Sequence, residues 1–117
     1  MRHHNKNRKF GRVRKVRTGL MRSLAHNLIL NGAITTTEAK AKALRPFVER
    51  LVTHAKEDTV AKRRHVASIL GNDDAAVKEL FGTIAPKYTE RQGGYTRIVR
   101  TAVRQGDSAT VARIMFV

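Results

Sequence analysis

Residues 35–56 read TTTEAKAKALRPFVERLVTHAK and carry the clearest helical pattern in the chain. Large apolar side chains recur here at three- and four-residue intervals, which places them on one face of a helix. The apolar positions are Leu44, Phe47, Val48, Leu51, Val52 and Ala55. Thr35 and Glu38 have the spacing of a capping box, which predicts the start of this helix. Pro46 falls inside the pattern, so the stretch is either one kinked helix or two abutting helices that meet near Arg45.

Shorter patterns precede this helix. Leucine recurs every fourth residue from Leu20 to Leu28, which predicts a helix over about residues 19–30. The Asn-Gly pair at 31–32 ends that helix, because both residues tolerate the left-handed conformation of a C-cap. Residues 33–36 are short and β-prone, and they predict an edge strand.

Two further helices are predicted in the middle of the chain. The Asp-Thr pair at 58–59 is suited to cap a helix over residues 60–70, and Gly-Asn-Asp at 71–73 ends it and caps a fourth helix. Gly82 and Pro86 mark the end of the fourth helix.

These two helices loosely fit a helix-turn-helix that reads DNA, because residues 60–81 place a glycine-containing turn between them. The second helix of such a motif should present basic and amide groups to base edges, yet this one is acidic, with Asp73, Asp74, Lys78 and Glu79. Three cations at 62–64 crowd the start of the first helix, where the helix dipole disfavours positive charge. Either a partner anion or solvent must compensate them.

The last quarter of the chain predicts a β-hairpin. Residues 95–104 and 110–117 alternate between two sets of side chains and are rich in β-branched types, and Gln-Gly-Asp-Ser at 105–108 is a turn signal. The chain is therefore expected to be an α+β protein. About four helices pack on a small, mainly antiparallel sheet with a C-terminal hairpin, and an extended basic N-terminal arm precedes them.

The positive charge is concentrated at the N-terminus. The 117 residues include 24 Lys or Arg and 9 Asp or Glu, for a formal charge of +15. Nine of these cations precede the first carboxylate, Glu38, and all nine lie within residues 1–22. The sequence divides accordingly into an arm, residues 1–17, and one α+β domain, residues 18–117. The arm has too few large apolar side chains to bury against a core.

The composition of the arm favours a nucleic acid as its partner. Arginine binds phosphate through two parallel hydrogen bonds, and Phe10 offers a ring for stacking on a base. A membrane-surface segment would instead place bulky apolar residues opposite the charge along a helix, and that pattern is absent. The plainer alternative is an arm that is merely solvated.

No catalytic or metal-binding motif is evident. The chain has no Cys, so thiolate nucleophiles, thiolate metal sites and disulfides are excluded. The five histidines are dispersed over the arm and three predicted helices, and the nine carboxylates suggest no paired acid and base. We expect no enzyme activity, no cofactor and no small-molecule substrate.

The chain closely resembles a known family along nearly its whole length. The sequence opens with MRH, continues with NGAITTTEAKAKALRPFVERLVTHAK, and later contains IAPKYTERQGGYTRI and RQGD. These blocks are similar to those of the bacterial large-subunit ribosomal protein seventeen family. The resemblance implies a mixed α/β domain in the cytoplasm, lodged on the large ribosomal subunit, with its arm inserted among large-subunit rRNA helices. It also implies neighbouring ribosomal proteins as partners, no membrane contact, no obligate homo-oligomer and no catalysis.

The predicted RNA-binding residues fall into two groups. Those of the N-terminal part are Arg2, His3, Lys6, Arg8, Lys9, Phe10, Arg12, Arg14, Lys15, Arg17 and Arg22. Those of the body are Lys40, Arg63, Arg64, Arg91, Tyr95, Arg97, Arg100 and Arg104. On the first hairpin strand, Arg100 and Arg104 are expected to share one face and Arg97 to lie on the other. The alternative for these arginines is that they flank a sheet edge and discourage pairing with other chains.

Overall fold

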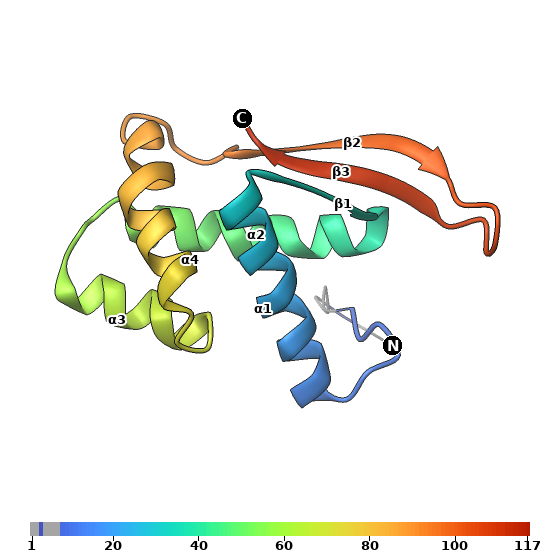
Figure 1. Cartoon of the computed structure of the whole chain (residues 1–117), viewed down its shortest axis with the longest axis horizontal. Coiled ribbons are helices and arrows are strands. Elements are labelled where there is room, and N and C mark those ends of the chain that lie inside the picture. The colour runs from blue at the N-terminus through green and yellow to red at the C-terminus, as the bar shows by residue number, and fades with distance from the viewer. Residues whose placement is uncertain (1–2, 4–7) are drawn as a thin grey trace.

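The computed structural model describes residue 3 and residues 8–117, so the predicted contacts of Arg2 and Lys6 lie outside the described residues. In the described part, helix α2 (Glu38–Ala55) lies between the sheet and the other helices (Figure 1). Its apolar face supplies Leu44, Val48 and Val52 to the core, and each of these side chains is fully buried. The predicted fold class, an α+β arrangement of four helices and an antiparallel sheet, is confirmed.

Helix α2 is one continuous helix. Pro46 lies inside it, on the exposed side, so the alternative of two abutting helices is wrong. The predicted capping box is also wrong: the helix begins at Glu38 after Thr37, whose side chain makes no capping hydrogen bond. The reason is that Thr35 belongs to strand β1 (Ala33–Thr37), where it pairs with the neighbouring strand and lies too early to cap the helix.

Helix α1 (Arg14–Asn31) starts earlier than the predicted residue 19. Its first turn therefore includes Arg14 and Arg17, which the sequence assigned to the arm. These arginines lie outside the apolar core and so contribute no apolar periodicity, but their helix propensity is sufficient to extend a helix that is anchored further along. The end of α1 is as predicted: Gly32 has φ 80°, and its amide donates to the Leu28 carbonyl at 2.8 Å.

The sheet has the order β1-β3-β2, and both pairs of strands are antiparallel. Strands β2 (Thr96–Val103) and β3 (Thr110–Phe116) form the predicted hairpin, and β1 is the predicted edge strand. Ala112 and Ile114 of the central strand are buried, and α2 packs on this side of the sheet. In Figure 1 the far end of the hairpin extends beyond the helices.

The hairpin contains an irregularity that the alternation pattern did not predict. Arg100 pairs with Ala112 but Ala102 pairs with Val111, so β2 has one extra residue, Thr101, at this point. A bulge of one residue reverses which side of the sheet the following side chains face. The expectation that Arg100 and Arg104 share one face is therefore wrong.

Helices α3 (Val60–Ile69) and α4 (Asp74–Glu79) begin at the predicted caps. Thr59 accepts a hydrogen bond from the Lys62 amide, and Asp73 accepts one from the Ala76 amide. The fourth helix does not end at Gly82, because the coil continues as a π-helical turn (Leu80–Ile84) and a 3-10 turn (Ala85–Tyr88). The buried side chains on these turns hold the coil together despite the glycine.

Candidate nucleic-acid interface

The described end of the N-terminal arm makes a turn before α1. Phe10 and Gly11 have φ values of 52° and 64°, in the left-handed region. The Arg12 amide donates to the Lys9 carbonyl at 3.1 Å, and the Arg12 guanidinium donates to the Phe10 carbonyl at 2.6 Å. Residues 8–12 thus change direction beside α1 and α2 (Figure 1).

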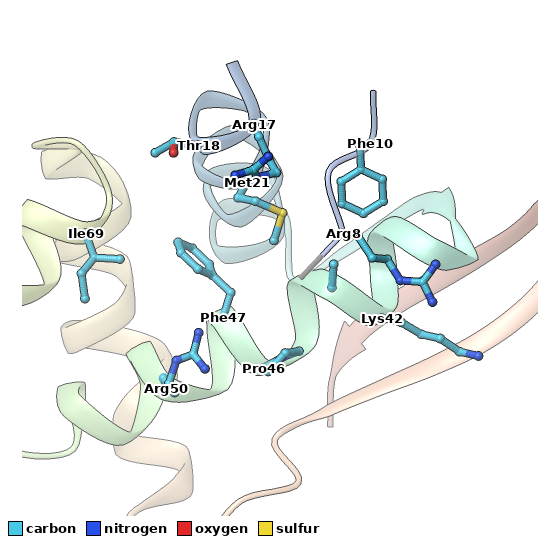
Figure 2. A pocket seen from close by; sticks show the side chains of 11 residues that line it. Arg8, Phe10, Arg17, Thr18, Met21, Lys42, Pro46, Phe47, Arg50 and Ile69 are labelled. Carbon is cyan, nitrogen blue, oxygen red and sulfur yellow. The ribbon is translucent and has the colours of Figure 1, made fainter. Parts of the chain in front are cut away.

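This turn forms one wall of a groove of about 600 Å³, whose other walls come from α1, α2 and the end of α3. Its apolar lining comes from Phe10, Met21, Phe47, Pro46 and Ile69. Figure 2 shows the Phe10 ring on the N-terminal segment and the Phe47 ring on α2, with the Met21 side chain drawn between them. Arm and body therefore share one concave surface.

The groove also carries positive charge. Arg8, Arg17, Lys42 and Arg50 line it, and no carboxylate of the described residues is part of its lining. Within the described part of the chain, Lys42 alone of these four forms an ion pair, with Glu38 at 2.8 Å. A cationic rim that is compensated only at Lys42, around an apolar floor, favours an anionic ligand that has an apolar face.

Two groove residues, Lys42 and Arg50, were not among the predicted contacts. A signal for them exists in the sequence: residues 42, 46 and 50 recur every four residues, so they lie along one side of α2. The apolar pattern of α2 indicates only which side of this helix is buried. It carries no signal for the exposed side, which holds Pro46. Conversely, Lys40 was predicted and lies on α2 half-buried, outside this groove.

The crowded cations at the start of α3 are partly compensated within the chain. Arg63 makes two hydrogen bonds to the Asp58 carboxylate, at 2.6 and 3.0 Å, and these bonds lower the pKa of Asp58 below its usual range. Lys62 lies 4.0 Å from Glu57. Arg64 is exposed and has no carboxylate partner in the described residues. The conflict with the helix dipole is thus relieved locally, and Arg64 is left facing solvent.

The arginines of the hairpin have different surroundings. Arg97 is exposed and pairs in register with Met115, on the opposite side of β2 from Arg100, as predicted. Arg100 reaches from β2 to the Glu38 carboxylate at 2.9 Å. Arg104 lies beyond the strand and bonds Asp107 in the turn, at 2.6 and 3.0 Å.

Tyr95 does not have the position that a stacking residue requires. Its side chain is 1% exposed and packs against the Tyr88 ring, with a centroid distance of 5.1 Å. Its hydroxyl donates to the Arg91 carbonyl at 3.1 Å, and the Lys56 ammonium lies 4.8 Å from its ring centroid. A buried ring has no free face for a base, so the burial of Tyr95 argues against the predicted RNA contact of this side chain. The side chain of Arg91 itself is exposed.

Arg22, which was predicted to bind RNA, and His26, one turn further along α1, both contact neighbouring helices. Arg22 donates to the Ile69 carbonyl at 2.9 Å, at the C-terminal end of α3, where the helix dipole favours a cation. His26 bonds the carboxylate of Asp73, the N-cap of α4. These side chains thus join α1 to α3 and α4, a structural role that the sequence did not predict.

The described histidines do not assemble a metal centre. The rings of His54 and His65 meet edge to face with a centroid distance of 4.7 Å, whereas His26 lies with Asp73. Burial lowers the pKa of His54, and Lys62 and His65 lower it further. In the part of the chain that the structure describes, no three His, Asp or Glu residues are placed to hold a metal ion. None of its helices is both long enough and apolar enough to cross a membrane.

The acidic residues of α4 make the helix-turn-helix interpretation weaker. This helix begins with Asp74 and ends with Glu79. A recognition helix has to reach base edges with donors along its exposed side, whereas the exposed Asp74 would face phosphates at close range.

Fold and surface together define a small basic α+β protein with a cationic groove and an N-terminal arm. Residues 20–117 match the family described as ribosomal protein L17, and the chain belongs to that family, as the sequence motifs predicted. It is 52% identical over 117 residues to large ribosomal subunit protein bL17 of Thermomicrobium roseum, covering 100% of this chain and 99% of the relative. The corresponding protein of a Hydrogenobaculum species is 51% identical over 118 residues, again covering 100% of this chain and 99% of the relative. The bL17 protein of Salinibacter ruber is 50% identical over 117 residues, and there this chain spans 59% of the relative's length.

Proposed function

We propose that this protein is a structural constituent of the large ribosomal subunit that binds rRNA through its N-terminal arm and through basic patches on its body. It performs no catalysis in this role. Membership of the ribosomal protein L17 family and the names of its relatives support the location. On this proposal the protein acts in the cytoplasm, with neighbouring large-subunit proteins as further partners and without forming an obligate homo-oligomer.

The observation that carries the proposal is the uneven compensation of charge. In the described residues, the carboxylates that form ion pairs hold cations of the body or its hairpin turn. The cations of residues 8–17 have no carboxylate partner in the same part of the chain, and they are Arg8, Lys9, Arg12, Arg14, Lys15 and Arg17. Such a segment repels itself, and a polyanion such as rRNA removes that repulsion.

The proposed contacts on the body also differ in whether the cation has a carboxylate partner. Arg63, Arg100 and Arg104 already bind carboxylates, so their contacts with phosphate would be shared with an internal partner. The remaining proposed contacts have no carboxylate partner in the described residues. They are Lys40, Arg64, Arg91 and Arg97. We expect this second group to contribute more to RNA affinity, because no internal bond has to be exchanged.

Removal of charge from the arm tests the proposal. The variant replaces all the cations before α1 by glutamine, so that the chain length and the helix are unchanged. The substituted positions are Arg2, Lys6, Arg8, Lys9 and Arg12. If each contacts one phosphate, the slope of log affinity against log salt should fall by roughly 0.7 to 0.9 for each lost contact. The measurement is filter binding of purified large-subunit rRNA at several salt concentrations.

The control is Lys78→Gln, which removes an exposed cation of α4 on the body, outside the proposed contacts. Its affinity and salt slope should stay close to those of the parent protein. An unchanged slope in the five-glutamine variant would mean that the arm does not bind rRNA phosphates.

A further inference from the structure

The groove between the N-terminal turn and helices α1 and α2 has features that backbone phosphate contacts alone do not require. Phosphate binding needs cations, whereas this groove also presents the half-buried side chains of Phe10, Met21 and Phe47. Met21 and Phe47 pack on the core with one side and line the groove with the other. The groove floor is therefore a firm apolar surface that is continuous with the core.

The apolar side chains of the groove floor and the cations of its rim are neighbours on the same helices. Arg50 is on the same side of α2 as Pro46 and next to Phe47, and Arg17 is one turn of α1 before Met21. Figure 2 shows the Arg50 and Phe47 side chains together on α2, and the Arg17 and Met21 side chains together on α1. A ligand that fills the groove thus meets apolar carbon and guanidinium groups at once.

We propose that this groove binds one unpaired nucleotide of RNA, with the base against Phe10 and Phe47 and the adjoining phosphate held by Arg17 and Arg50. The inference rests on the proposed rRNA-binding function and assigns a particular RNA feature to this site. A paired base has its faces covered by its neighbours in the stack, so a duplex offers backbone and base edges but no open base face to a groove of this kind. An unpaired nucleotide offers both a flat aromatic face and a negative charge, which is the combination that the lining matches.

The size and charge of the groove agree with this ligand. Its volume of about 600 Å³ is within the range of sites that enclose small molecules, and a nucleotide is of that class. The absence of any carboxylate from the lining that the described residues form favours an anion over a neutral or basic ligand. An acidic peptide is the other anionic ligand to test, and it lacks the flat aromatic face.

The experiment uses the full chain and two probes, a single-stranded eight-nucleotide oligouridylate and its duplex with oligoadenylate. Phe10→Ala removes the one groove ring that is outside the core, so the fold is preserved, which circular dichroism checks. We expect the affinity of this variant for the single strand to fall about fivefold or more, because base–aromatic stacking is lost. Its affinity for the duplex should be unchanged in fluorescence anisotropy.

Arg50→Gln supplies the second variant, with Lys78→Gln as the control for loss of one exposed cation. Arg50→Gln should lower the salt slope for the single strand by about 0.7, and Lys78→Gln should leave it unchanged. Photocrosslinking with 4-thiouridine in place of one uridine should label peptides that contain Phe10 or Phe47.

Equal losses of single-strand and duplex affinity in Phe10→Ala would overturn the proposal, because stacking on an unpaired base would then not be involved. It would also be overturned if a poly-glutamate peptide bound as tightly as the oligouridylate with the same sensitivity to Phe10→Ala, since the groove would then accept acidic peptides. The five-glutamine variant separates this inference from the proposed function. If the five-glutamine variant loses rRNA affinity, the proposed function is supported. If Phe10→Ala in the same series lowers single-strand and duplex affinity equally, the groove is rejected as a nucleotide site.

Discussion

The backbone amide of Tyr95 donates a hydrogen bond of 2.7 Å to the Glu49 carboxylate of helix α2. This bond joins the residue just before strand β2 to the helix that covers the sheet. It also explains the position of the Gly-Gly pair at 93–94, whose φ values of 80° and 64° turn the chain into that contact. Glycine adopts this left-handed conformation without the strain that a side chain introduces.

Glu49→Ala should destabilise the protein by about 1–3 kcal/mol, because the Tyr95 amide loses its acceptor at a half-buried site. Glu49→Gln retains an acceptor oxygen, so it should lower the free energy of unfolding by less than Glu49→Ala does. Urea denaturation followed by circular dichroism measures both free energies of unfolding. Equal stability of the alanine variant and the parent would show that solvent replaces this acceptor at no cost.

Substitutions at Tyr95 should affect folding and leave RNA binding unchanged. Tyr95→Ala opens a cavity in the core and should cost about 3–5 kcal/mol of stability. Tyr95→Phe removes the hydroxyl, and with it the bond to the Arg91 carbonyl, but keeps the ring, and should cost about 0.5–1.5 kcal/mol. The affinity of Tyr95→Phe for rRNA, measured by filter binding, should equal that of the parent. A clear loss of rRNA affinity in Tyr95→Phe would mean that the Tyr95 hydroxyl takes part in RNA binding.

Arg22→Leu should lower stability by about 1–3 kcal/mol, because the carbonyls at the end of α3 lose a charged donor. The guanidinium also lies against Gly71, where an added Cβ would be 3.2 Å from it, so Gly71→Ala should disturb the same contact. Thermal unfolding measures both effects. Ser23→Leu, one residue along and exposed, is the control that should change stability little.

The hairpin turn should show a distinct pH dependence. Hydrogen bonds from Arg104 and from the Ala109 amide lower the pKa of Asp107 to about 2. Because the folded pKa is below the unfolded one, this carboxylate stabilises the protein above the unfolded pKa, and the contribution is lost as pH falls toward the folded pKa.

A carboxyl NMR titration should therefore find the pKa of Asp107 closer to 3.8 in Arg104→Gln than in the parent. The stability difference between the two proteins should narrow as the pH falls from about 5 to about 2. A difference that stays constant over this range would mean that the Arg104–Asp107 bond does not persist in solution. Arg97→Gln, on the strand that leads into this turn and without a carboxylate partner in the described residues, is the matched control.

Several elements of the fold were predictable because their signals are local. The apolar stripe of α2, the Gly32 C-cap, the Thr59 and Asp73 caps and the hairpin alternation each depend on residues within a few positions of one another. The first turn of α1 was missed because its charged residues lie outside the apolar core and leave no apolar period. The bulge at Thr101 was missed because alternation in one strand does not report the register of its partner.

The functional surface divides in the same way. The excess of cations before Glu38 and the family membership follow from residue types and their order along the chain. The groove and the helix-end contact of Arg22 form only when α1, α2 and α3 pack together. The burial of Tyr95 depends on its contacts with Glu49, Lys56 and Tyr88, which are distant from it or lie in other elements. Local periodicity reports which side of an element is apolar, but the hydrophobic packing of all elements together sets which segment lies opposite. For that reason an aromatic residue beside arginines was taken for an RNA contact, and two groove cations on α2 were overlooked.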